Sequence, residues 1–190
     1  MMNDTRCIWC GDDPLYCAYH DQEWGVPLHN EHGWYERIVL ETMQAGLSWI
    51  TVLRKRDHYR RVCANFDPHI VAGYTDADVA RLVNDAGIIR NRAKIKAMIH
   101  NAQAFLTLQQ QKGSVDAFFW EFVDGVPLQP HRQQHADIPA VTPLAIQMAK
   151  SLRQHGFTFV GPTMCYALMQ ATGLVNDHVV TCHRHAVLAS

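Results

Sequence analysis

Cysteine and histidine residues gather near the two ends of this chain, and their types suit a metal ion. Cys7 and His20 lie near the N-terminus, whereas His178 and Cys182 lie near the C-terminus. The i, i+4 spacing of His178 and Cys182 predicts that both side chains lie on one face of a single helical turn. Two cysteines and two histidines suit tetrahedral zinc, and four protein ligands would leave no open position for catalysis.

Spacing alone leaves this ligand set open. Cys7 also forms a C-x-x-C pair with Cys10, and His183 and His185 are spare histidines close to Cys182. Because disulfides are rare in cytosolic proteins, the six cysteines argue against a disulfide framework. The alternative to a metal site is a set of buried cysteines and surface histidines.

A second group combines aromatic side chains with one carboxylate. Its members are Trp9, Tyr16, Tyr19, Glu41 and Trp49. Aromatic residues near helix starts usually belong to the hydrophobic core. The functional alternative is a stacking pocket for a nucleobase extruded from a duplex, with Glu41 reading the polar edge of the base.

A glycine-bearing turn separates two helical patterns near the C-terminus. It runs from Gly156 to Thr163 and includes Val160 and Gly161. This is the layout of a helix-hairpin-helix, in which backbone N–H groups of the turn and the next helix N-terminus face a DNA phosphate. Turns of this kind are common, so an ordinary corner between helices is the alternative.

The segments that must position these groups are helical almost throughout. Apolar residues recur at helical spacing, and no stretch shows the sustained two-residue alternation of strands, so the sequence predicts an all-α domain. The expected helical segments are Trp34 to Gln44, Ser48 to Asn65, a short helix opened by Thr75 to Asp78, Asn91 to Gln110, Ala117 to Val123, Pro143 to His155 and Gly161 to Thr172. The connection over residues 124–141 is irregular, and the sequence does not choose between a flexible loop and an ordered surface excursion.

Length and composition predict a cytoplasmic protein built as one domain over residues 1–190. The chain is 48% hydrophobic, which is enough to build a core without covalent help. It has no apolar run of the roughly 18 residues that a membrane span needs, and Met1 to Asp4 carry no apolar signal core. We therefore expect no membrane partner, and a monomer is the default.

The net charge of the chain does not by itself indicate a nucleic-acid partner. The net charge is −1 with neutral histidines, whereas nucleic-acid-binding domains are often basic. Basic residues nevertheless crowd two segments, residues 54–61 and residues 90–96. The alternative is that both segments are solvated helix faces.

Several short segments, together with the groups above, carry a family resemblance. They are Asp13-Pro14-Leu15-Tyr16, Ala18-Tyr19-His20-Asp21, Glu23-Trp24-Gly25-Val26-Pro27, Gln44-Ala45-Gly46-Leu47-Ser48-Trp49, Asp85-Ala86-Gly87-Ile88-Ile89-Arg90 and Gly173-Leu174-Val175-Asn176-Asp177-His178. From end to end the chain resembles the type I 3-methyladenine DNA glycosylases, a constitutive bacterial family of the helix-hairpin-helix superfamily.

The resemblance implies an all-α helix-hairpin-helix glycosylase fold in which one structural zinc ion joins the chain ends. By position, the implied ligands are Cys7, His20, His178 and Cys182. Cys7 is preferred to Cys10 because the family's cysteine directly follows an arginine and lies two residues before a tryptophan. No organic cofactor is expected, and the cysteine spacing of the iron–sulfur members is absent.

The implied activity is base-excision repair of double-stranded alkylated DNA, with 3-methyladenine as the released product. Tyr19 and Trp49 would stack on the cationic base, each contributing roughly 0.5–2 kcal/mol if desolvated. Glu41 would recognise its polar edge, and Tyr16 and Trp9 would complete the wall. The residues expected to fill the gap left in the duplex are Leu47 or its neighbours Gln44 and Gly46. The hairpin residues expected at the DNA backbone are Gly156, Val160, Gly161 and Thr163.

One departure from the wider superfamily bears on the chemistry. Many of its glycosylases carry a catalytic Asp after the hairpin, and Asn176 stands at that position here. The helix after the hairpin also lacks the lysine that bifunctional members use as a nucleophile. We therefore expect monofunctional hydrolysis by water without AP-lyase activity. The missing Asp suits a cationic purine, whose glycosidic bond is already weak.

Two other classes of protein would share some of these residues. A zinc-stapled DNA-binding module would have the hairpin and the metal site, but it would not need Glu41 beside aromatic residues. A zinc hydrolase or deaminase would need an open metal position, and the H-x-E…P-C-x-x-C deaminase pattern is not present.

Overall fold

The computed structural model describes residues 5–189. Met1 to Asp4, on which part of the localisation prediction rests, lie outside the described residues. The α-helices are α1 Pro14–Gln22, α2 Glu31–Gln44, α3 Trp49–Leu53, α4 Arg56–Val62, α5 Pro68–Val71, α6 Asp76–Val83, α7 Arg92–Lys112, α8 Val115–Trp120, α9 Pro143–Gln154, α10 Pro162–Ala171 and α11 His183–Val187. Short 3-10 turns lie between them at η1 Ile8–Cys10, η2 Ala64–Phe66, η3 Glu121–Val123 and η4 His135–Asp137.

The prediction of an all-α fold is confirmed. Over residues 5–189 there is no strand, and Leu128 and Val175 form an isolated parallel bridge. The buried apolar side chains form one hydrophobic core, to which α2, α7, α9 and α10 all contribute.

Side-chain caps explain where several helices begin. The N-terminal N–H groups of a helix have no partner within it, and a short polar side chain just before the helix can accept from them. Asp13 does this for α1, Asn30 for α2, Asn91 for α7 and Thr142 for α9. These caps fix where the four helices begin.

The segment from Ser48 to Asn65 differs from the single helical pattern that its apolar spacing suggested. It contains α3 and α4, followed by the start of η2. The break lies at Arg54 and Lys55, where the Lys55 N–H donates to the Val52 carbonyl at 2.9 Å in a tight turn. The turn redirects the chain so that Leu53 and Tyr59 are both buried in the core.

The prediction that His178 and Cys182 share one helical turn is wrong. Both residues lie in irregular turns that precede α11, and the Cys182 N–H donates to the Val179 carbonyl at 2.8 Å. Cys182 is the N-cap of α11, with its sulfur accepting from the Arg184 N–H. The two side chains converge because this turn folds back, not because of helical periodicity.

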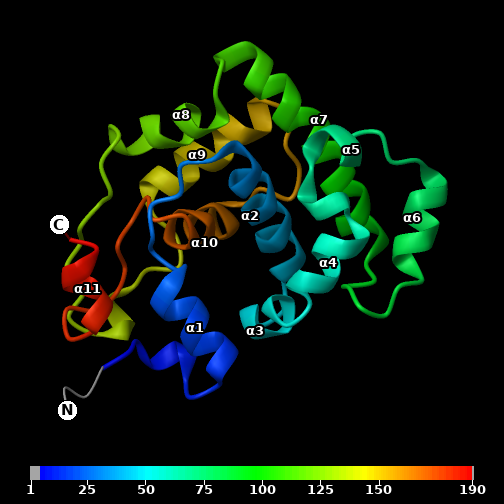
Figure 1. The fold of residues 1–190 in the computed structure, drawn as a ribbon. Helices are drawn as coiled ribbons and strands as arrows, with labels where there is room; N and C mark the ends of the chain where they lie inside the picture. Colours follow the sequence, from blue (N-terminus) through cyan, green and yellow to red (C-terminus); the bar gives the residue numbers. More distant parts are fainter. Residues whose placement is uncertain (1–4, 190) are drawn as a thin grey trace.

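Helix α10 lies near the middle of the molecule, and the N-terminal segment before α1 and the C-terminal α11 lie on one side of it (Figure 1). It packs against α9 and α2, and α2 in turn packs against α7. Gly173 follows α10 at φ +73°, and an added Cβ there would come within 2.4 Å of the Pro27 nitrogen. Near the termini, the His183 N–H donates to the Thr5 carbonyl at 2.9 Å.

The irregular connection over residues 124–141 is held by hydrogen bonds to the segment after α10. Leu128 donates to the Leu174 carbonyl and accepts from the Asn176 N–H, both at 2.9 Å. The Arg132 carbonyl accepts from the Val180 N–H at 2.8 Å. Of the two alternatives, the structure favours an ordered excursion that carries η4.

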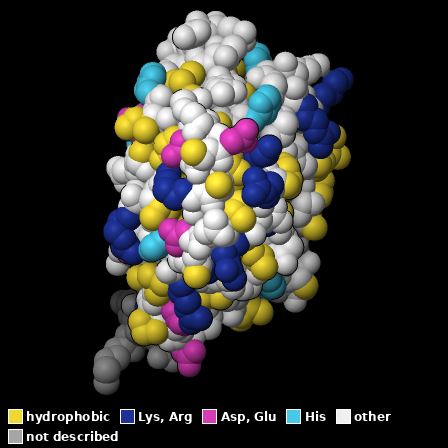
Figure 2. All heavy atoms as spheres, turned by 90° about the vertical axis from the view of Figure 1, so that its right-hand side faces the viewer, with side chains coloured by type: hydrophobic (Ala, Val, Ile, Leu, Met, Phe, Trp, Pro, Cys, Tyr) yellow, Lys and Arg dark blue, Asp and Glu magenta, His cyan; other side chains and the backbone are white. Residues whose placement is uncertain are grey.

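Charge is distributed rather than concentrated on the surface that carries α6. Figure 2 shows Lys and Arg side chains there interspersed with acidic, histidine and hydrophobic side chains. Much of the first basic cluster is engaged within the protein, since Arg56 pairs with Glu23 and Arg60 pairs with Glu36. None of the described helices is both long and apolar enough to span a bilayer.

Candidate base pocket and metal site

The aromatic and carboxylate residues singled out from the sequence converge on one pocket of about 280 Å³. Pockets for drug-sized ligands span about 300–1,000 Å³, so this volume suits a ligand as small as a nucleobase. The residues that line it are Trp9, Tyr16, Tyr19, Trp24, Glu41, Gln44, Trp49, His135, Ile138, Pro139, Ala140, Thr163, Tyr166, Ala167 and Gln170. The five expected base-pocket residues are therefore brought together.

The aromatic wall is built from three short segments. Trp9 lies on η1, Tyr16 and Tyr19 lie one turn apart on α1, and Trp49 begins α3. Ring centroids are separated by 5.0 Å for Trp9 and Tyr16, and by 5.2 Å for Tyr19 and Trp49. These distances lie in the range of favourable aromatic packing, so the wall is a preformed apolar surface.

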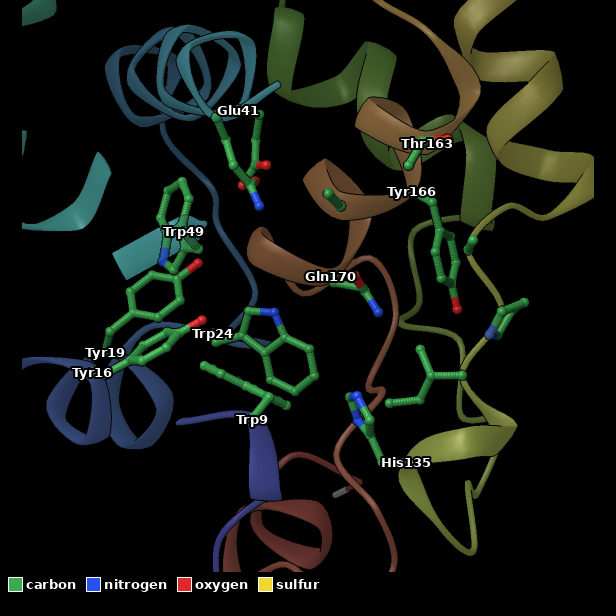
Figure 3. A pocket seen from close by; sticks show the side chains of 15 residues that line it. Trp9, Tyr16, Tyr19, Trp24, Glu41, Trp49, His135, Thr163, Tyr166 and Gln170 are labelled. Carbon is green, nitrogen blue, oxygen red and sulfur yellow. The ribbon is translucent and has the colours of Figure 1, made fainter. Parts of the chain in front are cut away.

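Glu41 points from α2 into the space between this wall and α10 (Figure 3). Its side chain is buried, and its Oε2 atom has no hydrogen-bond partner among the described residues. Burial raises the pKa of Glu41 to about 8, although the nearby charge of Arg37 opposes the shift. A buried carboxyl oxygen without a partner is costly, and such groups mark sites where a ligand completes the bonding.

Two indole nitrogens at the pocket are also unpaired. The Nε1 atoms of Trp9 and Trp49 are buried and have no acceptor in the part of the chain that the structure describes. Buried indole N–H groups usually find an acceptor. The pocket thus offers unused donors as well as an unused carboxyl oxygen.

The second wall of the pocket was not predicted from the sequence. Thr163, Tyr166, Ala167 and Gln170 line the pocket from one face of α10. Their spacing of three, four and seven residues is the helical signature of a common face. This stripe was available as a signal, but only Thr163 was singled out, and it was assigned to the DNA backbone.

Other lining residues gave no such signal. Trp24 follows α1, whereas His135 and Ile138 come from the irregular connection. Their position depends on how residues 124–141 dock onto the segment after α10. No local pattern in the sequence encodes that docking.

The expected wedge residues lie at the C-terminal end of α2 and in the connection to α3 that follows it. Gln44 lines the pocket, Gly46 has φ +78°, and the Leu47 side chain is 40% exposed. The buried Lys94 of α7 anchors this region, because its Nζ donates to the Met43 and Ala45 carbonyls at 2.8 and 2.6 Å.

The glycine-bearing turn is anchored to α7. Asn101 is buried, with its side chain accepting from the Thr158 N–H at 2.8 Å and donating to the Thr158 carbonyl at 3.0 Å. Gly156 has φ +86°, Val160 is buried, and Gly161 is the N-cap of α10. An added Cβ at Gly161 would meet nothing within 4 Å, so local packing does not require glycine there.

Cys7, His20, His178 and Cys182 form a buried cluster in which all four ligand atoms lie within 4.8 Å of one another. The Cys182 sulfur lies 3.5 Å from His20 Nε2 and 3.4 Å from His178 Nδ1. Sulfur and nitrogen ligands of a tetrahedral zinc ion are about 3.5 Å apart, given bond lengths of about 2.3 and 2.0 Å. The cluster could therefore hold a metal ion.

Each histidine of the cluster is oriented by a partner on its other nitrogen. His20 Nδ1 donates to the Asp21 carboxylate at 2.8 Å, and His178 Nε2 donates to the Trp24 carbonyl at 3.0 Å. These bonds leave the nitrogens that face the cluster free of a proton, as metal ligation requires. Cys10 and His185 are not members of the cluster, although both are buried.

Asn176 lies outside the set of pocket-lining residues. Its amide nitrogen donates to Gln129 Oε1 at 2.8 Å and to the His185 carbonyl at 3.1 Å. The neighbouring Asp177 does not replace a catalytic carboxylate in the pocket, because its oxygens accept from Arg132, Tyr166 and Gln170.

An all-helical fold with a small pocket of aromatic residues and one buried carboxyl group matches a known class of enzyme. The family model for methyladenine glycosylase matches residues 9–185. The chain therefore belongs to the methyladenine glycosylase family, among the type I 3-methyladenine DNA glycosylases, and it is a glycosylase.

Particular relatives agree with this assignment. The chain is 51% identical to the DNA-3-methyladenine glycosylase 1 of Escherichia coli K12 over 93% of this chain and 95% of that protein. A crystal structure of 3-methyladenine DNA glycosylase I matches with a TM-score of 0.93 at 50% identity, covering 95% of this chain and all of that one. A structure described as the basis of 3-methyladenine recognition by the Staphylococcus aureus enzyme matches with a TM-score of 0.92 at 34% identity, covering 95% and 96%.

Proposed function

We propose that this protein excises 3-methyladenine from alkylated double-stranded DNA by hydrolysing its N-glycosidic bond, as a step of base-excision repair. The observation that carries the proposal is the buried carboxyl group of Glu41, which has an unpaired oxygen inside an aromatic pocket of nucleobase size. The relatives named for 3-methyladenine support the identity of the base.

In this proposal Tyr19 and Trp49 stack on the extruded cationic base, and Tyr16 and Trp9 close the wall around it. Glu41 accepts from the polar edge of the base. Because the pKa of Glu41 is about 8, its carboxyl group is mostly protonated in the empty pocket at neutral pH. A bound cation favours the ionised form, so Glu41 would lose its proton when the cationic base enters the pocket.

The reaction breaks the bond between the base and C1′ of the sugar, and water supplies the hydroxyl group that C1′ gains. The base leaves as neutral 3-methyladenine, and one proton is released. Since the bond of a cationic purine is already weak, the pocket mainly has to extrude and hold the base. An undamaged adenine is a poorer leaving group, which contributes to selectivity.

The residues that line the pocket support hydrolysis without strand cleavage. None of the lining residues is a lysine. Lys94 is buried and engaged by two backbone carbonyls, so it is not available to form a Schiff base. Asn176 is held outside the pocket, which supports a non-catalytic role.

DNA would be bound by the α9–α10 pair acting as a helix-hairpin-helix. Gly156, Val160, Gly161 and Thr163 would present backbone N–H groups and the α10 N-terminus to a phosphate. The exposed connection between α2 and α3 would enter the duplex, with Leu47 or its neighbours Gln44 and Gly46 filling the space of the extruded nucleotide. This role is supported by Gln44, which lines the pocket, and by the exposed side chain of Leu47.

The Cys7, His20, His178 and Cys182 cluster would hold one structural zinc ion. Its donor set, burial and ligand spacing fit zinc with four protein ligands. The ion would tie the N-terminal segment to the segment before α11 and take no part in the reaction. An iron–sulfur cluster or an organic cofactor has no role in the proposal. A single domain over residues 1–190, a monomeric state and a cytoplasmic location stay predictions.

Base release from methylated DNA tests the proposed function, with the free bases separated by chromatography. The expected result is release of 3-methyladenine, with 7-methylguanine retained and the strands intact. If a folded, metal-loaded protein releases no base, the proposed excision of 3-methyladenine is wrong for this chain, and DNA binding without excision becomes the better account. Release accompanied by strand cleavage would contradict the monofunctional mechanism.

A further inference from the structure

Asp177 joins three side chains that surround the base pocket. It is fully buried, and its Oδ1 accepts from Arg132 Nε at 3.1 Å. Its Oδ2 accepts from the Tyr166 hydroxyl at 2.5 Å and from Gln170 Nε2 at 2.9 Å. Tyr166 and Gln170 both line the pocket, whereas Asp177 does not. The carboxylate therefore acts on the pocket through its neighbours.

These contacts fix the direction of the Gln170 amide. A carboxylate paired with an arginine can only accept hydrogen bonds, so the Gln170 atom that faces Asp177 must be the amide nitrogen. The Gln170 carbonyl oxygen then remains for the pocket, which the side chain lines from α10 (Figure 3). This oxygen makes no hydrogen bond within residues 5–189 and is free to accept one from a ligand.

We propose that Gln170 is a second base-reading residue and that Asp177 is the positioning residue that aims it. Glu41 extends from α2 and Gln170 from α10, so two acceptors reach the pocket from different helices. Two acceptors select a purine that presents N–H donors and carries positive charge. This inference rests on the proposed base pocket and extends its specificity to α10.

Arg132 gives the same carboxylate a second task. It belongs to the irregular connection that supplies His135 and Ile138 to the pocket wall. Its ion pair with Asp177, together with the hydrogen bond from Val180 to its carbonyl, holds that connection against the segment after α10. The buried carboxylate of Asp177 thus fixes both the orientation of the Gln170 amide and the position of the connection that carries His135 and Ile138.

The first test is the affinity of free 3-methyladenine for the full-length protein, followed by quenching of tryptophan fluorescence. Gln170→Leu keeps a side chain of similar size but removes the acceptor. We expect its Kd to rise about tenfold, the effect of losing one hydrogen bond. The matched control is Gln103→Leu on α7, whose amide donates to the Ala72 carbonyl outside the pocket, and its Kd should not change.

A double-mutant cycle tests the role of Asp177. Asp177→Asn weakens the orientation of Gln170, so it should raise the Kd in the parent but add little in the Gln170→Leu background. A purely structural role would instead give additive effects and would overturn the positioning claim. Metal content and melting temperature are measured for each variant, because Asp177 precedes His178.

Glu41→Gln separates this inference from the proposed function. If Glu41→Gln binds 3-methyladenine more weakly and Gln170→Leu binds it like the parent, the role of Gln170 is wrong while the pocket stands. If the parent does not bind 3-methyladenine, the pocket proposal fails and this inference fails with it. If Asp177→Asn does not fold, Gln170→Leu still tests whether Gln170 reads the base.

Discussion

The cluster of Cys7, His20, His178 and Cys182 and the candidate base pocket are neighbours that are built in opposite ways. In the cluster, both histidines are held by partners on their outer nitrogens, Asp21 and the Trp24 carbonyl. In the pocket, Glu41 Oε2 and the indole nitrogens of Trp9 and Trp49 have no partner in the described chain. The histidines of the cluster are therefore fixed by hydrogen bonds within the protein, whereas the pocket keeps unpaired polar atoms that a ligand can bind.

Two glutamates that both sense the charge of Arg37 show the same contrast. Burial alone would raise the pKa of Glu23, but the Arg56 hydrogen bonds and the charge of Arg37 outweigh it and lower the pKa to about 2. Glu41 has no such ion pair, and its pKa rises to about 8. A carboxyl group kept unpaired in the core lowers stability, and function is the usual reason for it.

The two regions are also in contact. The Trp24 ring lies 4.6 Å from the His178 ring and 4.9 Å from the Trp9 ring, between centroids. The carbonyl that orients a cluster histidine and a ring that lines the pocket therefore belong to one residue. A metal ion in the cluster would stiffen this side of the pocket without touching the base.

The largest expected effect is that of metal removal. Structural zinc sites contribute on the order of 10 kcal/mol to folding, and about 1 kcal/mol shifts the melting temperature of a domain of this size by about 2–4 °C. We expect one zinc ion per purified chain, and a fall of the melting temperature by about 10 °C or more in Cys182→Ser or with a chelator. Metal analysis and calorimetry measure both.

Cys17→Ser is the matched control for that prediction. Cys17 is not a member of the cluster, and its sulfur contacts the Gly11 carbonyl near the surface. Its substitution should change stability by about 0.5 kcal/mol or less. A metal-free protein whose melting temperature ignores chelators would show that the four residues are not a metal site.

The pH dependence of stability should change in Glu41→Gln. The folded-state pKa of Glu41 is raised, so the folded protein holds a proton that the unfolded chain loses above about pH 4.5. Stability is therefore lost as the pH rises toward 8, by at most on the order of 5 kcal/mol. Urea unfolding should show Glu41→Gln becoming more stable than the parent between pH 6 and pH 9. A difference that does not grow with pH would contradict a protonated Glu41.

A smaller effect is expected for a substitution in the hairpin, which should change DNA affinity but not stability. In Gly161→Ala the added methyl group meets no protein atom within 4 Å, so the melting temperature should stay close to that of the parent. If a phosphate approaches this backbone, the methyl group should weaken DNA affinity about fivefold, close to the loss of one hydrogen bond. Fluorescence anisotropy with duplex DNA measures it, and Gly73→Ala serves as the control. Unchanged affinity would place the phosphate contact elsewhere.

Local signals in the sequence were enough to find most of the longer helices and one wall of the pocket, whereas α1, α5 and α11 were not predicted. The capping residues Asn91 and Thr142 and the prolines in first turns mark helix starts independently of tertiary contacts. The cluster residues were found by type and resemblance, although the helical turn expected for His178 and Cys182 is absent. Chain reversal brought those two together, and spacing rules do not describe it.

The second wall depends on contacts between segments distant in sequence. Tyr166 and Gln170 follow helical spacing from Thr163, so they could have been grouped from the sequence. Their orientation could not, because it depends on Asp177, which lies in the chain reversal after α10. His135 reaches the pocket only because the Arg132 segment docks against that same reversal.

The measurement that tests the central claim most directly is the rate of 3-methyladenine release from methylated DNA by Glu41→Gln. Glu36→Gln is the matched control, since Glu36 lies on the same helix but pairs with Arg60 outside the pocket. We expect Glu41→Gln to lose about 100-fold or more in single-turnover rate, in the range of one acid–base or electrostatic contribution, while Glu36→Gln keeps most of its activity. Equal rates for the parent and a folded Glu41→Gln would contradict the account of the pocket.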